Sequence, residues 1–245
     1  MPVSARPEAA VRTAKEIARA IIDGLSSDDR AAVTFVNNAA AIQDFTNDRS
    51  LLVAAIEKFR SRPQPGSSTL LTLTELAAKL GELPNRRKIL LYVGPGERFD
   101  PRVLTAAATP GVSAFASGAM ATIFSRMQNL FRQAQRANVN VYTFDVNGLS
   151  APGPGEFDPR KNQREFLQIV ARETGARSVT GDNAPGREAG RILAENASYY
   201  LIGFRSTNAA ADGSYRRLEV KVSRGGMTVR SRRGYFSPKS GGRPD

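Results

Sequence analysis

The apolar residues of this chain recur with a helical period over several long segments. Between Pro7 and Gly24 they are spaced three and four residues apart, which places them on one face of an amphipathic helix. Gly24 is a typical C-cap for that helix, and Thr46 is a favourable N-cap for the next one. The same period predicts further helices over residues 48–59, 69–80, 115–137, 162–174 and 186–197.

Two shorter runs are apolar without alternation. Residues 88–93 read KILLYV and residues 139–144 read VNVYTF. Strands that are buried on both faces have this composition, and such strands occur in parallel sheets. Residues 31–36 and 40–45 predict a pair of strands, and residues 177–179 predict a short one. Because strands and helices alternate, we expect an α/β fold with a doubly wound, mostly parallel sheet.

The last part of the chain changes character. Residues 199–205, 215–223 and 227–233 predict three strands joined by turns, and in the middle one apolar and charged residues alternate. We therefore expect a C-terminal antiparallel β-meander. The predicted organisation is an α/β domain over residues 1–197, a β extension over residues 198–238 and a disordered tail over residues 239–245.

The composition restricts the chemistry that the chain can perform. The sequence has no histidine and no cysteine, so a Ser-His-Asp or Cys-His catalytic arrangement is impossible within it. No pair of carboxylates stands at a spacing that suggests acid–base catalysis, and we expect no enzymatic activity. A bound metal would have to be a hard cation with oxygen ligands, such as Mg²⁺.

The charge offers an alternative function. The net charge is +12, and the densest basic cluster contains Arg230, Arg232 and Arg233. Such a patch can bind nucleic acid or another anionic surface, and that binding would weaken steeply with salt. The other arginines are spread along the chain, and no aromatic residues interleave with them to stack on bases. We favour a solvated surface and do not expect nucleic acid as the partner.

Neither a signal peptide nor a transmembrane helix is predicted. The first 22 residues have an amphipathic pattern without the apolar core of a signal peptide. Residues 103–125 carry no charge and are long enough to span a bilayer, but alanine, threonine, serine and glycine dominate them and Pro110-Gly111 interrupts them. Their low hydrophobicity argues against a membrane helix.

Four segments resemble the von Willebrand factor A family, and more narrowly the VWFA-related proteins of Acidobacteria. They are residues 29–56, residues 86–96 (RRKILLYVGPG), residues 139–149 (VNVYTFDVNGL) and residues 195–238. The last segment contains the Tyr-Tyr, Asp-Gly and Arg-Arg-Gly-Tyr-Phe elements of the subgroup. The resemblance implies a bacterial, non-enzymatic protein-interaction module of the adhesion type. It also implies export to the periplasm or the extracellular space.

The resemblance further implies a metal-dependent adhesion site, which this chain carries in degenerate form. The family holds Mg²⁺ or Mn²⁺ with an Asp-x-Ser-x-Ser motif after its first strand, a loop threonine and a later aspartate. Thr69 matches the threonine, although a helix N-cap is an equal interpretation. Pro95 stands in place of the aspartate, and the motif with its strand is absent. We expect no cofactor in this chain, and Mg²⁺ or Mn²⁺ only if the N-terminus is extended.

Two explanations of the absent motif stay open, a start codon assigned too late or a degenerate paralogue, and we favour the first. In either case the partner is expected to be a protein that binds the loops at the carboxyl end of the sheet, where open α/β sheets bind their ligands. The candidate loop residues are Ser67, Ser68, Thr69, Gly94, Pro95 and Gly96, together with residues 147–155. Asp145 is interpreted as a turn residue and Glu97 as a solvated loop acid.

Overall fold

The predicted helices form within a few residues of their expected bounds. The computed structural model describes residues 7–36, 43–60, 69–83, 86–97, 114–148, 160–182, 185–197, 203–208, 210–226, 229, 231–232 and 234–237. The helices are α1 (Pro7–Asp23), α2 (Arg49–Glu57), α3 (Thr69–Gly81), α5 (Ala114–Arg136), α6 (Lys161–Glu173) and α7 (Pro185–Ala197). Among these described residues, no helix is both long and apolar enough to cross a membrane.

One predicted helix start is wrong. The N-cap of α2 is Asp48, whose carboxylate accepts the main-chain N–H groups of Ser50 (2.8 Å) and Leu51 (3.4 Å). Thr46 lies two residues before Asp48, and its hydroxyl accepts the N–H of Asp48 at 3.0 Å. An aspartate is the better cap here because its charge also complements the positive end of the helix dipole.

The centre of the fold is a parallel sheet. Strand β4 (Val139–Phe144) lies between β3 (Lys88–Val93) and β5 (Ser178–Val179), and all three run in the same direction. All six residues of β4 are buried, as the unbroken apolar pattern predicts for a central strand. The α/β class with parallel strands is therefore confirmed.

The remaining strands form two separate sheets. Strands β1 (Ala31–Val33) and β2 (Gln43–Thr46) pair with each other in antiparallel fashion. Strands β6 (Tyr215–Arg217) and β7 (Gly234–Phe236) form the other antiparallel pair. Within the described residues, neither pair is hydrogen-bonded to the parallel sheet, so the described strands do not by themselves form the predicted doubly wound sheet.

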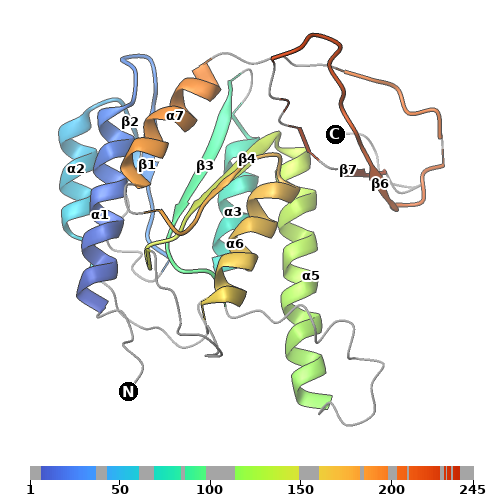
Figure 1. The fold of residues 1–245 in the computed structure, drawn as a ribbon, viewed down its shortest axis with the longest axis horizontal. Coiled ribbons are helices and arrows are strands. Elements are labelled where there is room, and N and C mark those ends of the chain that lie inside the picture. Colours follow the sequence, from blue (N-terminus) through green and yellow to red (C-terminus); the bar gives the residue numbers. More distant parts are fainter. Residues whose placement is uncertain are drawn as a thin grey trace.

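Helices cover both faces of the parallel sheet (Figure 1). On one face, α1 and α7 pack their Ile17 and Ile192 onto Tyr142 and Phe144 of β4. On the other face, α3, α5 and α6 bury a second apolar cluster with Val139, Val141 and Leu90. Its helical members are Leu70, Leu73, Met127, Leu130, Phe166, Leu167 and Val170. The odd and even residues of β4 thus serve opposite cores.

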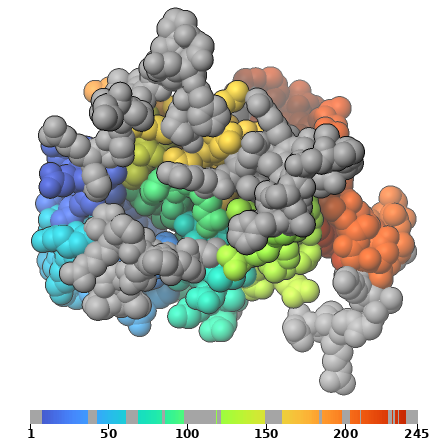
Figure 2. Space-filling model, turned by 90° about the horizontal axis from the view of Figure 1, so that it is seen from below, coloured from blue at the N-terminus to red at the C-terminus, as the bar shows by residue number. Residues whose placement is uncertain are grey.

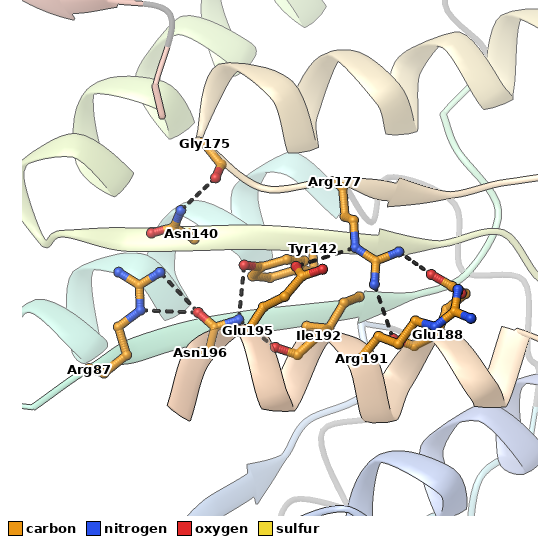
Figure 3. Close-up of polar contacts among 10 residues, drawn as sticks. All are labelled: Arg87, Asn140, Tyr142, Gly175, Arg177, Glu188, Arg191, Ile192, Glu195 and Asn196. Carbon is orange, nitrogen blue, oxygen red and sulfur yellow. Dashed lines mark hydrogen bonds and ion pairs between the residues drawn. The ribbon is translucent and has the colours of Figure 1, made fainter. Parts of the chain in front are cut away.

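Polar contacts fasten α7 to the sheet (Figure 3). The amide oxygen of Asn196 accepts both Nε (3.1 Å) and Nη2 (2.9 Å) of Arg87, and its amide nitrogen donates to the Tyr142 hydroxyl at 2.9 Å. Nearby, the guanidinium of Arg177 pairs with the carboxylates of Glu188 and Glu195. Every member of this network has a partner inside it, which identifies it as a structural clasp and not a ligand site.

Replacing Glu188 with glutamine is expected to lower the free energy of unfolding by about 1.5 kcal/mol at pH 7, because a hydrogen bond to a charged group is lost. The Arg177 hydrogen bond holds the pKa of Glu188 below its usual value of 4.5. This contribution is therefore present above the unfolded-state pKa and disappears as the pH falls through the folded-state pKa. Urea unfolding between pH 3 and pH 7 checks it, and an equal difference at every pH would contradict it.

The C-terminal meander is shorter than predicted. The middle strand stops at Arg217, and Val220 and Val222 beyond it remain 39% and 44% exposed. Among the described residues, these valines are not buried against an apolar layer, so the alternating pattern does not produce a longer strand here. Of the predicted first strand, residues 203–205 are described and are not strand. Most of the predicted third strand, including Met227 and Thr228, lies outside the described residues.

The β6–β7 pair is nevertheless attached to the α/β domain, beside α5 (Figure 1). The side chain of Gln135 bonds both main-chain groups of Phe236, accepting its N–H at 2.8 Å and donating to its carbonyl at 3.3 Å. The Tyr215 hydroxyl bonds the carboxylate of Glu173 at 3.2 Å. These contacts fix the extension at the end of α5, far from the β1–β2 pair.

Candidate ligand-binding face

The candidate loop residues gather where the parallel strands end. Residues 94–97 follow β3 directly, Asp145 follows β4, and the first residue of α3 is Thr69. Figure 2 views the molecule from this side, with the green end of β3 near the middle of the view. Ser67, Ser68 and residues 149–155 lie outside the described residues. Thr69, Gly94, Pro95 and Gly96 are thus the candidates that the structure places, and together they form what we call the loop face.

A tyrosine that the sequence analysis did not select links these residues. The hydroxyl of Tyr92 donates to the main-chain carbonyl of Pro95 at 2.8 Å, and the Thr69 side chain is hydrogen-bonded to the same hydroxyl. Burial, with a smaller contribution from the charges of Glu97 and Asp145, raises the pKa of Tyr92 to about 12, and the Thr69 bond acts in the opposite direction. Tyr92 therefore connects the start of α3 to the turn after β3.

Glu97 has a structural role that its position in a loop did not reveal. Its carboxylate accepts the main-chain N–H of Leu70 at 3.3 Å. This N–H is one of the unpaired donors in the first turn of α3, and a carboxylate there also complements the helix dipole. The interpretation of Glu97 as a solvated acid is therefore wrong, since it caps α3 through Leu70, which stands 27 residues earlier in the chain.

The two glycines of the turn allow close approaches. The N–H of Gly94 donates to the carbonyl of Phe144 at 3.0 Å and extends the ladder between β3 and β4. A side chain at Gly94 would meet the Tyr92 hydroxyl at 2.7 Å, and one at Gly96 would meet the carbonyl oxygen of Gln163 at 1.9 Å. The turn therefore lies flat against α6, while Pro95 between the two glycines is exposed.

Asp145 is a buried turn residue, as the sequence analysis interpreted it. Its carboxylate accepts the main-chain N–H (2.9 Å) and the side-chain amide (3.0 Å) of Asn147. Burial raises its pKa, while the bonds from Asn147 and the charges of Arg164 and Arg160 lower it. One oxygen of the carboxylate thus already serves two donors within the turn.

Among the described residues of the loop face, Thr69 is the one side chain that matches a cation ligand of the family. Across the described residues, no group of three or more acidic side chains is placed to hold a metal. The Thr69 hydroxyl, which the family resemblance offers as a ligand, is bonded to Tyr92. Pro95 supplies no side-chain oxygen, and its carbonyl accepts the Tyr92 proton. Hydrogen bonds of the Tyr92 hydroxyl to Pro95 and Thr69 thus hold this turn together, at the place where the family resemblance implies a bound metal ion.

The proposed basic cluster is only partly described, and its described member is engaged. The guanidinium of Arg232 donates to the carbonyls of Ala134 (3.3 Å) and Gln135 (3.2 Å) and to the side chain of Asn138 (3.2 Å). It thereby caps the carboxyl end of α5, where a cation also complements the helix dipole. Burial lowers the pKa of Arg232. Arg230 and Arg233 lie outside the described residues.

Comparisons with known proteins give no relative for this chain. No protein-family model matches it, and no match is found among the curated proteins or the solved structures.

Replacing Tyr92 with phenylalanine is expected to lower the free energy of unfolding by about 1 kcal/mol at pH 8, because its hydrogen bonds are lost. The unfolded chain ionises this tyrosine near 10.0 and the folded chain near 12. Wild-type stability should therefore fall between these values, by up to about 1.4 kcal/mol per pH unit from this group. Urea unfolding at pH 8 to 11 compares the two proteins, and the variant should lose less stability as the pH rises.

Proposed function

We propose that this chain is a non-enzymatic protein-interaction module of the von Willebrand factor A kind, with a degenerate metal-dependent adhesion site. Its parallel strands would belong to a doubly wound sheet, and its partner would bind the loop face. Export to the periplasm or the extracellular space is part of the proposal. The absence of histidine and cysteine from the sequence supports a non-enzymatic role, because it removes the commonest catalytic bases and nucleophiles.

The observation that carries the proposal is the contact between Tyr92 and the turn at Pro95. It joins the Thr69 hydroxyl and the Pro95 carbonyl through one side chain, in a turn where Pro95 replaces the family's aspartate and supplies no side-chain oxygen. It also holds Pro95 exposed at the carboxyl edge of the sheet, where open α/β sheets bind ligands. A rigid, exposed turn of this kind contributes to binding by its shape, because little conformational freedom is lost when a partner docks.

A peptide display selection tests the proposal. Random peptides are selected on the immobilised protein in EDTA, and the resulting binders are titrated against P95E and against E82A. Glu82 is exposed at the opposite end of α3, so its replacement is a matched control. We expect binders that tolerate EDTA, lose at least about tenfold in affinity to P95E, equivalent to 1.4 kcal/mol, and bind E82A unchanged.

The proposal fails if selection in EDTA yields no binders while the same selection in Mg²⁺ or Mn²⁺ does. It also fails if the selected binders bind P95E as tightly as the wild type, since the loop face would then not be the binding surface. Circular dichroism of P95E is needed alongside, and we expect a folded protein because the main-chain carbonyl that accepts from Tyr92 is retained.

A further inference from the structure

The turn after β4 contains the single Asn-Gly pair of the sequence, Asn147-Gly148. An asparagine that precedes a glycine can lose its side-chain amide without an enzyme. The main-chain nitrogen of the glycine attacks the side-chain carbonyl carbon of the asparagine, and glycine carries no side chain that would block the approach. Whether such a pair reacts in a folded protein depends on how the fold holds it.

The attacking group of this pair is accessible. Asn147 and Gly148 are both partly exposed. Gly148 has a φ of 63°, and nothing lies within 4 Å of the position where its Cβ atom would stand. Among the residues that the structure describes, none accepts a hydrogen bond from the Gly148 N–H. This part of the chain therefore neither covers the attacking nitrogen nor engages it.

The amide that would be lost faces a buried carboxylate. The side-chain nitrogen of Asn147 donates to Oδ1 of Asp145 at 3.0 Å, and the main-chain N–H of Asn147 donates to the same oxygen at 2.9 Å. Asp145 is only 4% exposed, and its own N–H donates to the carbonyl of Val179 in β5 at 2.9 Å. An oxygen in place of the amide nitrogen would set two carboxylates against each other, which like charges disfavour.

We propose that Asn147 is a site of spontaneous deamidation, and that this modification releases the turn after β4. The Gly148 nitrogen bonds to Cγ of Asn147, and the bond between Cγ and Nδ2 breaks. Ammonia leaves with the proton of the Gly148 nitrogen, and a cyclic succinimide remains. Water then opens the ring at either carbonyl and gives aspartate or isoaspartate. The net reaction consumes one water and releases one ammonia, so it needs no oxidant, reductant or cofactor.

Both products change the turn. Aspartate at position 147 replaces the donor that faces Asp145 with a negative charge, and isoaspartate also inserts a methylene group into the main chain. Because the turn follows β4 at the carboxyl edge of the sheet, beside the loop face, the modification alters this end of the molecule as the protein ages. The inference concerns the chemistry of the chain itself and does not rest on the proposed function.

Mass spectrometry of the wild-type protein tests the reaction. The folded protein is held at pH 8 and digested at intervals, and each asparagine peptide is analysed for conversion of the amide to the acid. A synthetic peptide of residues 143–150 is the reference without a fold. We expect Asn147 in the protein to convert within tenfold of the rate in the peptide. It should also convert at least tenfold faster than the exposed Asn129 and Asn208, which precede residues with side chains.

Three variants separate the reaction from its consequence. N147Q keeps an amide but closes the ring far less readily, so it should stay unmodified at this position. In N147D, which has the product side chain, amide exchange at residue 145 should be at least tenfold faster than in the wild type. D145N/N147D again sets a donor against an acceptor, and its exchange should return to the wild-type value.

Two results would overturn the inference. One is an Asn147 that stays intact in the protein while the peptide converts completely, because the fold would then protect the pair. The other is unchanged amide exchange at residue 145 in N147D. Arg164 and Arg160, whose charges act on Asp145, would then neutralise the added carboxylate, and the modification would not release the turn.

Discussion

Replacing Phe144 with alanine is expected to lower the free energy of unfolding by about 3–5 kcal/mol. Phe144 is 0% exposed at the end of β4 and packs beneath α1 and α7 with Ile17, Val179 and Ile192. Removing its ring leaves a cavity between the sheet and two helices, and these elements can close only part of it. Urea unfolding followed by far-ultraviolet circular dichroism measures the loss.

The matched control is the same substitution at Phe124 on α5, which is 42% exposed. The Phe124 ring is already partly exposed to water, so removing it gives up less buried apolar surface. We therefore expect the free energy of unfolding to change by no more than about 1 kcal/mol. Comparable losses at the two positions would contradict the assignment of β4 to the centre of the fold.

Replacing Gly96 with alanine is expected to destabilise the protein by about 3 kcal/mol, the upper end of the range for an overpacked site. The new methyl group would stand 1.9 Å from the carbonyl oxygen of Gln163 and 2.7 Å from its carbon. Both atoms belong to the main chain of α6, so the clash cannot be relieved by rotating a side chain. Either the turn or the helix must shift.

The control is Gly118→Ala in α5, where nothing lies within 4 Å of the added methyl group. Alanine favours a helix over glycine, and this variant should be more stable by about 0.5–1 kcal/mol. The same chemical change should thus act with opposite sign at the two positions. If G96A proved as stable as the wild type, the close packing of the turn against α6 would be refuted.

The strongly periodic parts of the sequence predicted their structure well. The unbroken apolar runs became β3 and β4, and the helical period placed α1, α3 and α5 within a few residues of their observed bounds. Each of these elements forms because one of its faces, or both, can be buried, and the spacing of apolar residues in the sequence indicates those faces directly. In the C-terminal extension the alternating pattern failed, and Val220 and Val222 remain exposed among the described residues.

The contacts that define the loop face could not be predicted from the pattern. The carboxylate of Glu97 caps a helix 27 residues earlier in the chain, and the Tyr92 hydroxyl joins Thr69 to Pro95 across two elements. Such contacts depend on how strands and helices are placed in space, which local periodicity does not contain. One indication was present, because a tyrosine in an apolar strand must find a partner for its hydroxyl when it is buried.

The central claim is that the loop face functions without a metal ion, and titration calorimetry with Mg²⁺ and Mn²⁺ tests it most directly. The account predicts no saturable heat for either ion, because Pro95 supplies no carboxylate where the family has its aspartate and the Thr69 hydroxyl is bonded to Tyr92. Y92F serves as the comparison, since it frees the Thr69 hydroxyl from this bond. A one-site binding curve for the wild-type protein that T69A or D145N abolishes would contradict the account.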